Sequence, residues 1–139
     1  MDQSKGILLK ENKQYESWEL IDLLRFGPAG VCEFNETRVE YQSRGYDICL
    51  THHRSFAGLK LKGINFSKFW QSWTNFDHAD LSDADFSGAD LKDSTFRNTN
   101  LNGAKFDGAN LKGTCFWGAK NMSQELQERI IKESRESWK

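Results

Sequence analysis

The most constraining feature of the sequence is a large apolar residue that returns at every fifth position over residues 56–116. Twelve of the thirteen positions in this series are Phe or Leu, and the exception is Gln71. Helices bury side chains at a period near 3.6 and strands at a period of 2, so neither element explains this spacing. The predicted interior consists of Phe66, Phe76, Leu81, Phe86, Leu91, Phe96, Leu101, Phe106, Leu111 and Phe116.

The residues between these positions indicate how the chain turns. A small residue usually stands two positions before each apolar one, and Asp, Asn, Gly, Lys and Ser dominate the rest. Two inward positions separated by one residue describe a short extended segment, and the polar residues suit a turn. We therefore expect a flat-sided coil that, with four sides, takes about twenty residues per turn. Phe and Leu alternate, so each should occupy two opposite sides.

The segments FDHADLSDADFSGADLKDST and LNGAKFDGANLKGTCFWGAK resemble the pentapeptide-repeat family, whose motif is A(D/N)LXX. The resemblance covers residues 56–120 and implies a mainly β fold, a right-handed quadrilateral β-helix of about 3–4 coils. The stretch FSKFWQSWTNF departs from the motif, because Phe69 takes a small position and Gln71 a large one. We expect that side to bulge or repack, with the Phe69 ring supplying the bulk that Gln71 lacks.

The chain outside the repeats is predicted to be helical at both ends. Residues 15–27 carry an apolar stripe, and residues 28–43 begin with Pro, which suits a first helical turn. Residues 46–51 are predicted as a short strand that leads into the coils. A last helix, with Ser123 as N-cap, should cover the open edge of the final coil. The expected organisation is an N-terminal segment 1–50, a β-helix 51–121 and a capping helix 122–139.

The composition indicates the cellular compartment in which the protein is expected. The formal net charge is −1, and the three Cys residues show no CxxC pairing. An apolar run long enough for a signal peptide or a membrane span is missing from the sequence. These features favour a protein of the reducing cytoplasm with no membrane partner.

No catalytic, cofactor or metal site is predicted, and the sequence does not indicate an enzyme. His52 and His53 are neighbours on an extended chain and would point apart, while His78 stands alone. The Asp and Asn residues before the apolar positions suggest paired carboxylates, but side-chain bonding to turns explains them. Cys115 has no identifiable basic companion that would lower its pKa.

The candidate partner contacts lie on the predicted outer surface. Trp70 and Trp73 either bind a partner or pack beneath the N-terminal helices, and the sequence favours neither alternative. For Trp117 we favour cover by the C-terminal helix. Residues 76–95 hold six Asp against Lys92, between two more basic segments, and this acidic belt is expected to orient a partner. The candidates are Phe69, Trp70, Trp73, Asp77, Asp80, Asp83, Asp85 and Trp117.

These features favour a non-catalytic protein–protein interaction module, a rigid rod that binds a protein partner through its faces. The alternative is a DNA-mimicking inhibitor or protector of a DNA-binding protein such as DNA gyrase, a role that the family resemblance implies. A mimic needs negative charge along its whole length, and here one coil carries most of it. Direct nucleic-acid binding is not favoured, because the basic segments are interrupted. A homodimer is left open.

Overall fold

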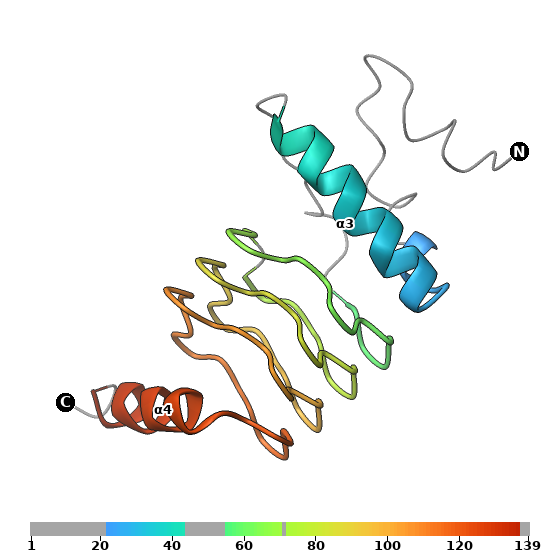
Figure 1. Ribbon diagram of the computed structural model, residues 1–139. Helices are drawn as coiled ribbons and strands as arrows, with labels where there is room; N and C mark the ends of the chain where they lie inside the picture. Colours follow the sequence, from blue (N-terminus) through green and yellow to red (C-terminus); the bar gives the residue numbers. More distant parts are fainter. Residues whose placement is uncertain (1–21, 44–54, 71, 137–139) are drawn as a thin grey trace, which may run out of the picture.

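The described part of the chain is a stack of coils with a helix at each end (Figure 1). The computed structural model describes residues 22–43, 55–70 and 72–136. Helix α3 spans Pro28–Ser43 and helix α4 spans Gln124–Glu136, at opposite ends of the stack. The predicted helix over residues 28–43 is confirmed, and so is the C-terminal helix as far as it is described.

Parallel pairing between successive coils confirms the predicted twenty residues per turn. Every fifth residue bridges the residue twenty positions later, from Ser55 with Asn75 to Asn100 with Lys120. Four bridge positions per turn divide the coil into four sides. The chain therefore forms a β-helix with a first coil (55–74), a second coil (75–94), a third coil (95–114) and the start of a fourth.

Each corner of the coil is a tight turn with a left-handed residue. At one corner of the second coil, Ala79 N donates to Phe76 O at 3.0 Å, and His78 between them has a φ of 63°. A type II turn has this geometry and favours Gly or Asn at the left-handed position. The same position has a positive φ at every described corner from Gly58 to Gly118. The polar, Gly-rich composition of the repeat thus follows from its corners.

The interior is filled by stacked rings and aliphatic side chains. Phe76, Phe96 and Phe116 stack in one column, with successive ring centroids 4.8 and 5.1 Å apart. Rings of the two Phe columns meet edge-on, as Phe86 and Phe96 do at 5.5 Å and an interplanar angle of 85°. All ten residues of the predicted interior are buried. The middle of the stack is therefore solid.

Helix α3 covers the first coil with side chains that replace a preceding coil. Arg38 donates from Nη1 to the Asn65 carbonyl at 2.7 Å and from Nη2 to the Ser67 carbonyl at 2.5 Å. Asn65 N donates to Asn35 Oδ1 at 2.8 Å. One coil later, the equivalent groups bond to the main chain of the coil below. Two side chains of α3 thus reproduce three hydrogen bonds of the ladder.

Apolar contacts complete this cap. The Phe34 ring meets Phe66 edge-on at a centroid distance of 5.6 Å, and Leu24 and Val31 are buried beside it. Arg38 is itself fully buried and stands on the inner side of α3. A charged residue on the inner side explains why the apolar periodicity of residues 28–43 is weak.

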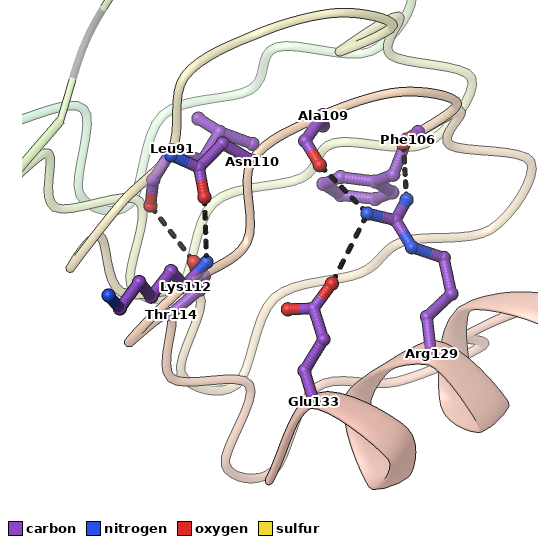
Figure 2. A network of polar contacts seen from close by, with 8 residues as sticks. All are labelled: Leu91, Phe106, Ala109, Asn110, Lys112, Thr114, Arg129 and Glu133. Atoms are coloured by element: carbon purple, nitrogen blue, oxygen red, sulfur yellow. Dashed lines mark hydrogen bonds and ion pairs between the residues drawn. The ribbon is translucent and has the colours of Figure 1, made fainter. Parts of the chain in front are cut away.

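Helix α4 covers the last coil less completely. Its N-cap is confirmed, because Ser123 Oγ accepts a bond from the main-chain N–H three residues later at 3.1 Å. Arg129 donates to the carbonyls of Phe106 (2.6 Å) and Ala109 (2.7 Å), and Glu133 lies 3.5 Å from its guanidinium (Figure 2). The innermost rings of the first coil are 0% exposed, whereas Phe106 is 5% exposed and the final ring 8%.

Some predictions fall outside the described residues. The strand predicted over 46–51 and the histidines at 52 and 53 lie outside them. So does most of the helix predicted over 15–27, although its residues 22–24 are described and are helical. The packing of Gln71 and the end of the last helix beyond residue 136 also lie outside.

Candidate functional site

Carboxylates and amides before the apolar positions are engaged in the turns. Asp80 Oδ1 accepts a bond from Ser82 N at 3.1 Å, and Asp85 Oδ1 accepts one from Ser87 N at 2.9 Å. These bonds to the residue two positions later are Asx turns. The same bond forms at Asn75, Asp90, Asn100 and Asn110. Within residues 22–43, 55–70 and 72–136, no three His, Cys, Asp or Glu residues gather to hold a metal ion.

The four Asp residues predicted as partner contacts do not share a surface. Asp77 accepts a bond from Arg97 N at 2.9 Å on one side of the second coil. Asp80 and Asp83 belong to the next side and Asp85 to the one after it, because the bridges at Asn75, Asp80 and Asp85 mark three sides. No one flat partner surface can contact all four. The acidic belt therefore runs around the second coil, and its expected role in orienting a partner stays a prediction.

The fourth side carries the tryptophans, and its backbone is regular. We call it the tryptophan side: residues 69–74 in the first coil, 89–94 in the second and 109–114 in the third. Trp70 bridges Asp90, and Trp73 N donates to Lys92 O at 2.9 Å, as Asp90 and Asp93 do with Asn110 and Lys112 one coil later. The expected bulge is absent at the described residues on both sides of Gln71.

Phe69 is an interior residue of this side. It is 3% exposed, its ring centroid lies 4.8 Å from that of Phe66, and the Arg38 guanidinium carbon lies 5.2 Å from it. Its proposal as a partner contact is therefore wrong. The ring occupies a position where all the later repeats have Ala, Ser or Thr, and the cationic side chain of α3 closes over it.

Trp70 and Trp73 point outward from the same side. They are 86% and 62% exposed, so helix α3 does not cover them. Trp70 takes a position at which Asp90 and Asn110 accept the turn bond, which an indole ring cannot do. Trp73 is at the left-handed corner, with a φ of 62°, where a bulky side chain is unfavourable. Neither residue suits the turn that it occupies.

Trp117 is also exposed, at 72%, so the expectation that α4 covers it is wrong. It lies on a different side, in the fourth coil, and follows Asp77 and Arg97 at intervals of twenty residues. Helix α4 instead reaches the side that contains Phe106, through Arg129. Trp117 therefore does not extend the surface made by Trp70 and Trp73.

Cys115 has a basic neighbour that the sequence did not reveal. The nearby Cys115 side chain and the Asp77 carboxylate raise the pKa of Arg97 above its ordinary value. The eighteen-residue separation of Arg97 and Cys115 becomes spatial proximity only once the period of the coil is known.

A hollow of about 760 Å³ lies between α4 and the tryptophan side of the third coil. Leu111, Phe116 and Ile130 contribute apolar surface, and Lys112 and Glu133 are among its polar residues. Figure 2 shows Lys112 and Glu133 near this end, where Arg129 bonds to the Ala109 carbonyl at the start of the tryptophan side. Helix α4 is thus held to this side at Ala109, and the hollow remains between the helix and the rest of the side.

Comparison with known proteins identifies the repeat. The sequence profile described as pentapeptide repeats matches residues 79–118 in eight copies. Residues 79–118 are pentapeptide repeats. The family resemblance of the sequence is thereby confirmed, and the ladder extends the same period to residues 55–120. Among the described residues, no helix combines the length and apolar content needed to cross a membrane.

Two solved structures of pentapeptide repeat proteins are similar to this chain. One, from the thylakoid lumen of Arabidopsis thaliana, is 28% identical over 56% of this chain and 57% of its own, with a TM-score of 0.42. The other, from the cyanobacterium Cyanothece 51142, is 25% identical over 44% of this chain and 54% of its own, with a TM-score of 0.20. The chain thus spans little more than half of either protein. No curated protein gives a significant sequence match.

Proposed function

We propose that the chain is a non-catalytic protein-interaction module, in which a right-handed quadrilateral β-helix holds Trp70 and Trp73 against a partner protein. The filled interior leaves the sides and ends of the stack for binding. Nothing described points to catalysis, because the carboxylates support the turns.

The observation that carries the proposal is the choice of residue at positions 70 and 73. A left-handed backbone costs a residue other than Gly roughly 1–2 kcal/mol. Exposed indole rings add no packing to offset that cost, and both Trp residues are largely exposed. Tryptophan is enriched among the residues that dominate protein–protein binding. Trp70 and Trp73 do not stabilise the fold, and binding to a partner explains why tryptophan stands at these two positions.

The arrangement of charge gives less support to DNA mimicry. Lys60 bridges Asp80, and Asp85 bridges Lys105, so acidic residues of the second coil have basic neighbours in the coils below and above. Duplex DNA presents negative charge along its whole axis. An acidic belt between basic coils differs from that pattern.

Capture from extracts of the native host tests the proposal. The immobilised full-length chain is compared with Trp70→Ala, Trp73→Ala and Trp117→Ala variants, and bound proteins are identified by mass spectrometry. We expect the first two variants to lose a partner that the wild type and the third variant retain. Equal capture by all four proteins would contradict the proposal. Thermal unfolding of each variant checks that the fold is intact, and size-exclusion chromatography shows whether a second copy is the partner.

A further inference from the structure

The residues next to the tryptophans indicate the chemistry of the partner, and this inference rests on the proposed function. Asp90 lies directly beside Trp70 in the next coil, because the two residues bridge. Asp93 follows Trp73 by one turn, at the equivalent left-handed corner, and Lys92 lies between the two carboxylates in sequence. Neighbouring strands are about 4.8 Å apart, so the backbones of Asp90 and Asp93 lie about one strand spacing from those of Trp70 and Trp73.

We propose that Trp70 and Trp73 receive the side chain of a Lys or Arg in a basic segment of the partner protein. The face of an indole ring attracts a cation more strongly than any other aromatic side chain does. The negative charges of the neighbouring carboxylates also attract a cation. The second coil as a whole supplies a wider negative field, with six Asp against Lys92.

The surroundings of Trp117 provide an internal contrast. Its ring is exposed to a similar degree, but Arg97 occupies the equivalent position one coil below. A cationic side chain would meet Arg97 there, whereas at the tryptophan side it would meet Asp90 and Asp93 against Lys92. Exposure is therefore matched between the two surfaces, and the sign of the adjacent charge differs.

The first experiment observes the five indole N–H signals of the full-length ¹⁵N-labelled chain by NMR. Single Trp→Phe variants assign the signals. The probe is a short Gly-rich peptide with two Arg residues, and the control is the same peptide with citrulline, a neutral isostere of Arg. We expect the Arg peptide to shift the signals of Trp70 and Trp73, to leave that of Trp117 in place, and to bind more weakly as salt is raised. Equal shifts with citrulline, or no shift with Arg, would overturn the proposal.

Charge variants of the protein sharpen the test. Asp90→Asn and Asp93→Asn should each weaken binding of the Arg peptide by about three- to fivefold, and Lys92→Gln should strengthen it by about two- to threefold. A short single-stranded oligonucleotide is titrated in parallel. If the oligonucleotide shifts the same two signals and Lys92→Gln weakens that binding, the ligand is an anion and the proposal is wrong.

The outcomes separate this inference from the proposed function. Suppose that Trp70→Ala and Trp73→Ala lose the native partner while Asp90→Asn and Asp93→Asn bind it as strongly as the wild type does. The proposed interaction surface is then supported, and the proposal that it binds a cationic side chain is wrong. If both Trp variants keep the partner, the proposed function itself fails.

Discussion

The tryptophan side has the same backbone in the first and second coils but very different side chains. Residues 89–94 follow the repeat, with Ala89 inside, Asp90 bonded to the turn and Asp93 at the left-handed corner. Residues 69–74 place Phe69 inside and an outward Trp at each of the other two positions. At the described residues of the two segments, the Trp70–Asp90 bridge and the bonds from Trp73 N to Lys92 O and from Asp90 N to Phe69 O nevertheless keep the ladder.

The comparison shows which interactions maintain the coil and which side chains only cover its surface. Backbone pairing and the Phe and Leu columns hold the register, so one side can depart from the repeat without a bulge at its described residues. Phe69 is accommodated because α3 covers the first coil and Arg38 reaches over the ring. Only an end coil has such a helix above it, so a large residue at the small position is tolerated here.

The largest expected effect comes from the regular part. Phe96→Ala removes a ring that stacks in its own column and meets the opposite column edge-on. A cavity of this kind should lower the free energy of unfolding by about 3–5 kcal/mol, measured by chemical denaturation. A change below about 1 kcal/mol would mean that the columns are loosely packed, and the contrast between regular and irregular coils would lose its basis.

The two capping arginines should differ in effect. Arg38→Met leaves two carbonyls of the buried first-coil edge without donors and removes the charge beside Phe69, so a loss of about 2–3 kcal/mol is expected. Arg129→Met should cost about 1 kcal/mol, because water can reach the more open end. The same denaturation experiment compares them, and equal losses would argue against a special role for Arg38 under the irregular side.

A glycine pair tests how tightly the corners stack. Gly108 and Gly113 both have a positive φ, at 68° and 72°. A Cβ at Gly113 would collide with the Asp93 carboxylate, whereas one at Gly108 would meet nothing closer than 3.9 Å. Gly108→Ala should cost about 1 kcal/mol and Gly113→Ala about 1 kcal/mol more. Combining Gly113→Ala with Asp93→Ala should remove the excess, and a persistent excess would contradict this explanation.

The smallest effect on stability, and the opposite in sign, is expected at the exposed tryptophans. Trp73→Gly relieves the left-handed strain, and Trp70→Asn restores the bond to the turn. Each should leave the free energy of unfolding unchanged or raise it by about 0.5–1 kcal/mol, while partner capture is lost. A substantial destabilisation would mean that the rings support the fold, and the proposed function would lose its main argument.

The period of five, the alternation of Phe and Leu and the Ser123 N-cap could all be predicted, because each depends on residues that are close in sequence. The cover of Phe69 by Arg38 and the proximity of Arg97 to Cys115 depend on residues from other elements or coils. Arg38 shows the limit most clearly, since a charged residue in a helix of weak periodicity gives no signal that it faces inward. Asp90 and Asp93 were missed as neighbours of the tryptophans because twenty residues separate them in the chain.

The ladder also gives the two ends of the stack complementary chemistry. The first coil turns the carbonyls of Asn65 and Ser67 outward, and two coils later the amides of Phe106 and Gly108 point the other way along the axis. These are the groups that successive turns join, so a bare stack could add another molecule head to tail and then another, with no symmetry to close the series. Because α3 occupies the carbonyls at one end and α4 lies across the other, the two helices should oppose growth of the stack into a filament.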